Sequence, residues 1–135
     1  MASALRPAVL RLARRLRQMR AHDFDLGTGQ LQAMGCLFRN GPMSIGELAQ
    51  REQVRPPSMT RTVDSLEELG LATRQTSEED RRRAMVELTD TGRDLVVKDR
   101  QRRDAWLTQR VADLTPQERA VLREAIPILE KVTAE

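Results

Sequence analysis

The stretch between residues 44 and 70 constrains the fold of this chain more than any other part of the sequence. Ser44, followed three residues later by Glu47, is the signature of a capping box and predicts the start of a short helix. Pro56 and Pro57 fix the backbone for a second helical start. The second helix then carries one apolar stripe, made of Met59, Val63, Leu66 and Leu69. Two short helices joined by a turn form a helix-turn-helix pattern.

Gly70 and the outer face of the second helix complete this pattern. A glycine directly after a helical stripe favours the left-handed residue that follows many helices, so we expect the helix to stop there. The apolar stripe leaves Ser58, Arg61 and Ser65 together on another face, at the spacing i, i+3 and i+7. On this helix, Ser58, Thr60 and Arg61 place short donors and one guanidinium where base edges could be reached, so these three residues are candidates for DNA contact.

Two short apolar segments follow, separated by a charged loop. Residues 71–75 and 85–88 are candidates for extended structure, and Val86 and Leu88 share one face of the second segment. The loop between them has no Asn-Gly or Asp-Gly pair, which predicts a hairpin loop longer than two residues. A hairpin directly after a helix-turn-helix forms a wing, so the middle of the chain is expected to be a winged helix-turn-helix.

Helical patterns flank this region on both sides. Apolar spacing predicts further helices over residues 5–19, 31–38, 89–113 and 116–132. Pro7 is compatible with the first turn of its helix, whereas Pro127 lies inside the last pattern and should kink or divide that helix. Thr115 and Glu118 form a second capping box. The expected fold is mainly α with a small β-hairpin.

Composition disfavours enzymes. A length of 135 residues favours one domain. The single Cys36 excludes an intramolecular disulfide framework and a cysteine-cluster metal site, and the single His22 excludes a centre with several histidines. Aromatic residues make up only 2% of the chain, too few for a typical sugar cleft or base-stacking platform.

The first helix and the charge balance suggest where the protein acts. No apolar run approaches the roughly 20 residues needed to cross a bilayer, and arginines interrupt the apolar positions of residues 1–20, so we expect a cytoplasmic protein with no membrane partner. The net charge is only +3, but arginines cluster locally, as at residues 81–83. Such clusters fit nucleic-acid binding and also fit a well-solvated helical surface, and composition alone does not decide between them.

Three motifs in register carry a family resemblance. They are Met43-Ser-Ile-Gly-Glu-Leu-Ala, Val54-Arg-Pro-Pro-Ser-Met-Thr-Arg-Thr-Val-Asp-Ser-Leu-Glu-Glu-Leu-Gly-Leu, and the wing Glu79-Asp-Arg-Arg-Arg-Ala-Met-Val-Glu-Leu-Thr-Asp-Thr-Gly. With its D-x-R wing and following L-T-x-x-G, the chain resembles the MarR family of bacterial transcription regulators over nearly its whole length. The resemblance implies a single MarR-like domain over residues 1–135, with a winged helix-turn-helix at 28–90 and dimerisation helices at 1–22 and 93–135.

The resemblance also implies partners and site residues. It implies a homodimer on a pseudo-palindromic site in double-stranded DNA. By position, Ser58, Thr60 and Arg61 match the major-groove face of the recognition helix. Arg82 matches the wing arginine that enters the minor groove, and Asp80 the acid that orients it. The full set of residues expected at DNA is Ser44, Arg55, Pro57, Ser58, Thr60, Arg61, Asp80, Arg81, Arg82 and Arg83.

Regulation by a ligand is a further implication. Family members often release DNA when a small lipophilic, frequently phenolic, compound binds between the dimerisation and DNA-binding parts. Others sense oxidants through a cysteine close to the N-terminus. This sequence departs from the second pattern, because Cys36 lies in the second predicted helix. We expect no cofactor and no metal ion.

Several residues keep a structural reading beside the functional one. Cys36 lies among apolar residues, which favours a buried small side chain over a redox switch. His22 suits a helix end or a pocket rim, and Trp106 suits packing better than a ligand platform. The favoured function is a ligand-responsive repressor. The alternative is a winged-helix module that binds protein without sequence-specific DNA binding, and an enzyme is a distant third.

Overall fold

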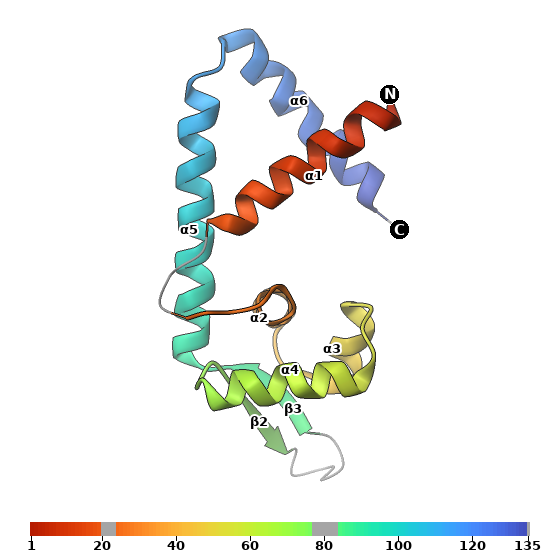
Figure 1. The fold of residues 1–135 in the computed structure, drawn as a ribbon, viewed down its shortest axis with the longest axis vertical. Coiled ribbons are helices and arrows are strands. Elements are labelled where there is room, and N and C mark those ends of the chain that lie inside the picture. Colours follow the sequence, from red (N-terminus) through yellow and green to blue (C-terminus); the bar gives the residue numbers. More distant parts are fainter. Residues whose placement is uncertain (20–23, 77–83, 135) are drawn as a thin grey trace. The chain divides into compact units, whose positions relative to one another are not determined.

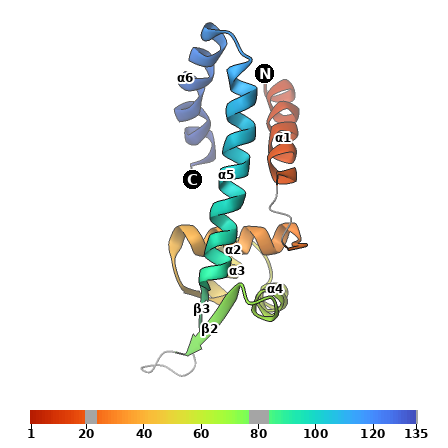
Figure 2. The same cartoon turned by 90° about the vertical axis from the view of Figure 1, so that its left-hand side faces the viewer.

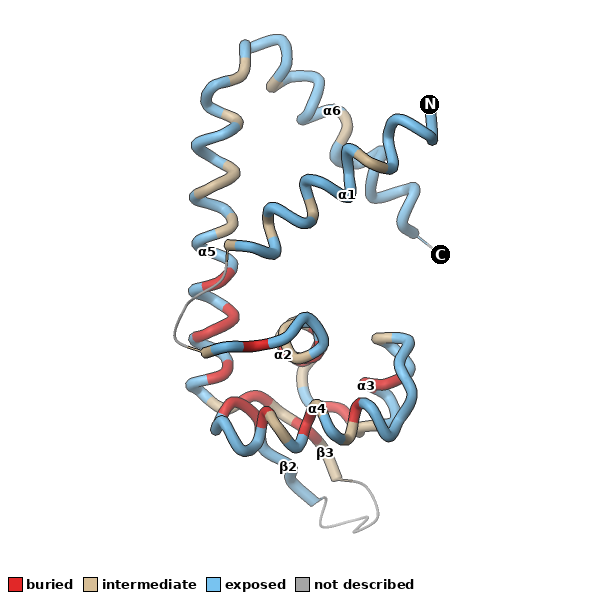
Figure 3. The backbone as a smooth tube through the Cα atoms, in the orientation of Figure 1, coloured by how far each residue is buried: buried red, intermediate tan, exposed pale blue. Residues whose placement is uncertain are grey.

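The computed structural model describes residues 1–19, 24–76 and 84–134. The chain forms two compact units, one of Met1–Arg20 with Gln101–Glu135 and one of Ala21–Arg100. Among the described residues, every buried apolar side chain lies between Leu26 and Val96, which places the hydrophobic core in the second unit (Figure 3).

The second unit holds the helix-turn-helix and the hairpin (Figure 1). Its elements are α2 (Thr28–Asn40), β1 (Met43–Ser44), α3 (Ile45–Arg51), α4 (Pro56–Glu68), β2 (Ala72–Thr76), β3 (Ala84–Leu88) and the start of α5 (Asp90–Ala112). The strands β2 and β3 project away from the group of α2, α3 and α4, as Figure 2 shows from a second direction. Mainly helical structure with a small sheet is the predicted fold class, and it is confirmed.

The sheet has one more strand than the sequence predicted. The three strands run in the order β1-β3-β2, with both pairs antiparallel. Met43 pairs with Val86, and Ala72 pairs with Leu88. Strand β1 escaped prediction because two residues are too short for an alternating pattern to be visible. Its pairing holds the segment before α3 beside β3, on the edge of the sheet opposite β2.

The apolar stripe of α4 packs as predicted except at its end. Met59, Val63 and Leu66 are buried against the core. Leu69, which the sequence placed in the same stripe, is 42% exposed because the helix ends at Glu68 and the chain turns away. The prediction for Leu69 was therefore wrong.

Gly70 ends α4 in the conformation that the sequence predicted. Its φ is +73°, the left-handed region that glycine adopts readily. The Gly70 N–H donates to the Glu67 carbonyl at 2.9 Å, and the Leu71 N–H donates to the Leu66 carbonyl at 2.9 Å. These two bonds form a Schellman motif, which satisfies carbonyl groups that the helix end leaves without partners. The turn therefore directs the chain straight from α4 into β2.

Thr89 joins this turn to the start of α5. Its hydroxyl donates to the Gly70 carbonyl at 2.7 Å and accepts from the Gly92 N–H at 3.0 Å, while its own N–H donates to the Leu71 carbonyl at 3.0 Å. A Cβ at Gly92 would lie 2.1 Å from the Leu71 carbonyl oxygen. Only glycine allows this approach, which explains the Leu-Thr-Asp-Thr-Gly spacing.

The first unit contains helices with little buried surface. Helix α1 (Ala2–Gln18) and helix α6 (Pro116–Thr133) bury none of their described residues. The Thr115–Glu118 capping box is confirmed, with reciprocal bonds of 3.1 Å and 2.9 Å. Pro127 does not divide α6, which is a single helix on both sides of it. Helix α1 begins earlier than predicted, so Pro7 lies beyond its first turn.

We predict that Gly92→Ala destabilises the protein, because the new methyl group would overlap the Leu71 carbonyl and force α5 away from the turn. The expected loss is about 1–3 kcal/mol in the free energy of unfolding, the range typical of overpacking. Urea denaturation followed by circular dichroism measures it.

Gly29→Ala is the matched control. Gly29 lies in the first turn of α2, and a Cβ there has no neighbour within 4 Å. Alanine favours helix over glycine, so this variant should be unchanged or more stable by up to about 1 kcal/mol. Equal stability of both variants would show that the approach of Gly92 to Leu71 is not a constraint.

Candidate nucleic-acid interface

Helix α4 presents three unpartnered polar side chains away from the core. Arg55, Ser58 and Arg61 are exposed, and none of them has a side-chain hydrogen bond or ion pair with another described residue. Arg61 lies on the side of the helix opposite the buried stripe, because it is 200° around the helix from Met59 at about 100° per residue. They are the free side-chain donors at the N-cap and in the first half of the helix, whereas Glu68, which is exposed and also unpartnered, lies at its other end.

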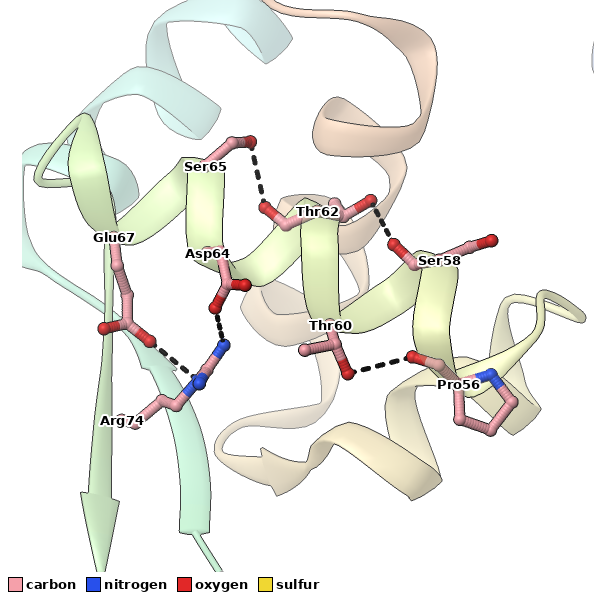
Figure 4. Close-up of polar contacts among 8 residues, drawn as sticks. All are labelled: Pro56, Ser58, Thr60, Thr62, Asp64, Ser65, Glu67 and Arg74. Atoms are coloured by element: carbon pink, nitrogen blue, oxygen red, sulfur yellow. Dashed lines mark hydrogen bonds and ion pairs between the residues drawn. The ribbon is translucent and has the colours of Figure 1, made fainter.

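The other hydroxyl groups of α4 are engaged within the protein (Figure 4). Thr60 Oγ1 donates to the Pro56 carbonyl at 3.0 Å, and Thr62 Oγ1 donates to the Ser58 carbonyl at 3.1 Å. Ser65 Oγ donates to the Thr62 carbonyl at 3.1 Å. Each of these three hydroxyl groups donates its hydrogen to a backbone carbonyl. They therefore have no hydrogen left to donate to a ligand, unlike the hydroxyl group of Ser58.

Ser65 lies on the same side of α4 as Ser58, as the sequence predicted, but its hydroxyl group is engaged within the protein (Figure 4). Its Oγ also accepts a hydrogen bond of 2.6 Å from Gln30 Nε2, and Gln30 Oε1 accepts from the Gly27 N–H at 2.8 Å. Ser65 therefore ties α4 to the start of α2. The helical spacing could not reveal this, because Gln30 lies 35 residues earlier in the chain.

The two prolines change what the start of α4 offers to an anion. Pro56 and Pro57 are the first two residues of the helix, and proline has no N–H. A helix start normally exposes several backbone N–H groups that bind phosphate, whereas here two of these donors are missing. Hydrogen bonds from this end of α4 must therefore come mainly from the Arg55 and Ser58 side chains.

Arg74 partly offsets the negative charge of the second half of α4, where Asp64, Glu67 and Glu68 lie. It lies on β2 and forms ion pairs with Asp64 and, at 2.7 Å, with Glu67 (Figure 4). Without Arg74, these carboxylates would repel DNA phosphates. No local spacing in the sequence predicts this role of Arg74, because its partners Asp64 and Glu67 lie in another element. The pairing leaves the residues before Asp64 as the basic part of the helix.

The remaining predicted site residues divide into two groups. Ser44 is half-buried, and its Oγ caps α3 by accepting the Glu47 N–H at 3.1 Å. Pro57 is exposed beside Ser58. The wing residues lie outside the described residues, so the structure gives no position for Asp80, Arg81, Arg82 and Arg83.

Cys36 lies on the buried face of α2. Burial raises the pKa of its thiol above the ordinary value, and the nearby Glu52 carboxylate raises it further. Asn40 Nδ2 donates to the Cys36 carbonyl at 3.0 Å and lies 3.5 Å from the sulfur. A thiol with a raised pKa forms little of the reactive thiolate at neutral pH. The environment therefore favours the packing role that the sequence suggested.

The first unit has two open cavities and one stacked tryptophan. A cavity of about 740 Å³ lies beside Leu107, Val111 and Arg119, and one of about 400 Å³ beside Val121 and Leu122. The guanidinium carbons of Arg15 and Arg110 lie 6.0 Å and 5.4 Å from the ring centre of Trp106. These are cation–π distances, so Trp106 holds α1 and α5 together, the packing role expected for it.

Among the described residues, no helix is both long and apolar enough to cross a membrane. Likewise, within residues 1–19, 24–76 and 84–134, no three acidic, histidine or cysteine side chains are grouped so that they could hold a metal ion.

Comparisons with known proteins agree with this architecture. The profile of the MarR family matches residues 27–84. The HTH-type transcriptional regulator MT0903.1 of Mycobacterium tuberculosis is 40% identical over 129 residues, which cover 96% of this chain and 90% of that protein. The crystal structure of RV1404 from Mycobacterium tuberculosis superposes with a TM-score of 0.86 at 26% identity, covering 100% of this chain and 96% of the other. A MarR family protein from Bacillus stearothermophilus gives a TM-score of 0.84 at 20% identity, covering 98% and 92%.

A winged helix-turn-helix with a basic, unpartnered helix start defines a DNA-binding transcriptional regulator, which is not a class of enzyme. The chain belongs to the MarR family. The resemblance found in the sequence is thereby confirmed.

We predict that Arg74→Ala weakens DNA binding about fivefold at low salt, because it removes a cation and exposes the carboxylates of Asp64 and Glu67 to phosphates. The melting temperature should change little, since partly exposed ion pairs contribute only about 0–1 kcal/mol to stability. Fluorescence anisotropy with labelled DNA measures the affinity.

The triple variant Asp64→Asn, Glu67→Gln, Arg74→Ala is the control for this prediction. It lacks the cation but also lacks both carboxylates, so this cluster is less negative than in the wild type and the affinity should return to at least that of the wild type. Wild-type affinity in Arg74→Ala itself would contradict this role of Arg74.

Proposed function

We propose that this regulator is a homodimeric repressor that binds a pseudo-palindromic operator and releases it when a small effector binds. The observation that carries the proposal is the outer face of α4, where Arg55, Ser58 and Arg61 are exposed and unpartnered. A polar helix face that the fold does not use is available for base edges in a major groove, whose width accepts one helix.

Each group at this face has a proposed role. Arg61 reads a guanine, because a guanidinium forms two parallel hydrogen bonds with the O6 and N7 of that base. Arg55 and Ser58 bind phosphates at the start of α4, replacing the N–H donors that the prolines lack. In the wing, Arg82 enters the minor groove, Asp80 orients it, and Arg81 and Arg83 lie near phosphates. Ser44 and Pro57 flank these contacts.

Two copies of the chain fit the proposal better than one. Helices α1 and α6 bury no residue, yet they carry large exposed apolar side chains: Leu5, Val9, Leu10, Leu12, Val121, Leu122, Ile126, Ile128, Leu129 and Val132. Apolar surface of this extent marks an interaction site. A symmetric dimer would cover it and set two recognition helices about 34–36 Å apart, one turn of DNA.

The regulatory part of the proposal comes from relatives. MdtR of Bacillus subtilis is described as an HTH-type transcriptional repressor and is 35% identical to this chain over 63 residues. The family resemblance supports a small lipophilic or phenolic effector. Binding to the bacterial chromosome would place the protein in the cytoplasm.

We predict that Arg61→Ala weakens binding to the operator by about 10- to 100-fold but leaves binding to random DNA almost unchanged. A bidentate contact with a base contributes about 1–3 kcal/mol of discrimination, which random sequence does not offer. Gel shifts with the DNA upstream of the protein's own gene, against a shuffled duplex of equal composition, measure both affinities. Equal losses on both duplexes would show that Arg61 binds phosphate only, and equal wild-type binding to both would favour a protein-interaction module.

We also predict that Ile126→Asp converts a dimer into monomers in sedimentation at micromolar concentration and abolishes operator binding, because a carboxylate would be buried in the apolar interface. Ile126 is 56% exposed in the single chain, so the monomer should fold. Leu69→Asp is the matched control for oligomeric state, since Leu69 is an exposed apolar residue outside α1 and α6. A wild-type protein that sediments as a folded monomer would contradict the dimer.

A further inference from the structure

We infer that Thr60 reads a thymine in the operator through its methyl group. This inference rests on the proposed function, because it assumes that α4 enters a major groove. The inference names a second base that α4 would select, in addition to the guanine proposed for Arg61, and the contact that would select it.

The hydroxyl group of Thr60 has already used its hydrogen. Thr60 Oγ1 donates to the Pro56 carbonyl at 3.0 Å, so the hydroxyl points back along the helix. Figure 4 shows the methyl group pointing away from Pro56. The side chain therefore directs its methyl group outward and has no free donor, while its oxygen, which can still accept a hydrogen bond, points back toward Pro56.

The position of Thr60 brings this methyl group within reach of DNA. Thr60 is partly exposed and directly precedes Arg61, in the part of α4 that lies before the acidic residues. Consecutive Cα atoms are about 3.8 Å apart, and base pairs are stacked about 3.4 Å apart. Because Thr60 and Arg61 are adjacent in α4, we expect the base that contacts Thr60 to lie close to the one read by Arg61.

Base chemistry then selects thymine. Guanine presents only acceptors in the major groove, and Thr60 has no free donor for them. Thymine alone presents a methyl group there, and an apolar contact between two methyl groups removes both from water. Ser58, whose hydroxyl is free, keeps the donor that Thr60 lacks.

Thr62 shows why the hydrogen bond alone is not sufficient. It makes the same bond, from Oγ1 to the carbonyl four residues earlier, at 3.1 Å. In Figure 4, however, Thr62 lies with Ser58 and Ser65 along one side of α4, whereas Thr60 lies on the other side with Asp64. Ser65 bonds to Gln30 of α2, so Thr62 lies toward α2 and away from the face of Thr60. Thr62 is therefore an internal control for Thr60.

The test begins with selection of the preferred duplex from a random pool by the wild-type protein. Each thymine of one half-site is then replaced by uracil, which removes only the methyl group. We expect one such position, close to the guanine that Arg61→Ala ceases to select, to weaken wild-type binding about fourfold, the equivalent of about 0.8 kcal/mol for one buried methyl group.

Three variants assign this loss to one side chain. Thr60→Ser should bind the thymine duplex about fourfold more weakly and should not distinguish thymine from uracil. Thr60→Val keeps a methyl group and loses the hydroxyl, so it should keep the distinction. Thr62→Ser should behave like the wild type.

The outcomes separate this inference from the function on which it rests. Selection of no preferred sequence by the wild type would overturn both. A preferred sequence with no uracil-sensitive position, or an equal uracil effect in wild type and Thr60→Ser, would overturn the methyl contact alone. Loss of the distinction in Thr60→Val would show that the hydroxyl reads the base and would also overturn it.

Discussion

The close approach of Gly92 to the Leu71 carbonyl is the constraint on which the DNA-binding unit depends. It brings together the end of α4, the first residue before β2 and the first turn of α5, and Thr89 joins them with three hydrogen bonds. Each of these elements leaves the junction in a fixed direction. The direction of α4 relative to β2 and α5 is therefore set at this junction, where Leu71 and Gly92 are buried.

The polar residues of α4 divide between holding the fold and remaining available. Thr62, Ser65 and Gln30 connect the helix to itself and to α2, while Arg74 partly offsets the acids of its second half. Because these groups are satisfied internally, the exposed face before Asp64 is left with a short set of free donors. Some polar side chains of α4 are bonded within the protein, and the others remain available to a ligand.

Local rules predicted most of this structure from the sequence. Gly70 after the stripe, the Thr115–Glu118 box and the hairpin all depend on residues close together in the chain, and all were found. Three features were not predicted because each depends on a partner in a distant element. They are strand β1, the bond between Ser65 and Gln30, and the ion pairs of Arg74. The prediction that Leu69 is buried was wrong because α4 ends at Glu68, and the spacing of apolar residues did not show where the helix ends.

The paired prolines at the start of α4 have a consequence for the thermodynamics of binding. Their rings hold the first two residues of the helix in helical geometry before any DNA is present, so association does not have to order this turn. In the proposed complex, this turn of α4 would therefore meet DNA already ordered. Any mismatch between the spacing of its contacts and straight B-form DNA must then be met by bending or twisting of the duplex, and the stiffness of base pairs that the protein never touches would become part of its selectivity.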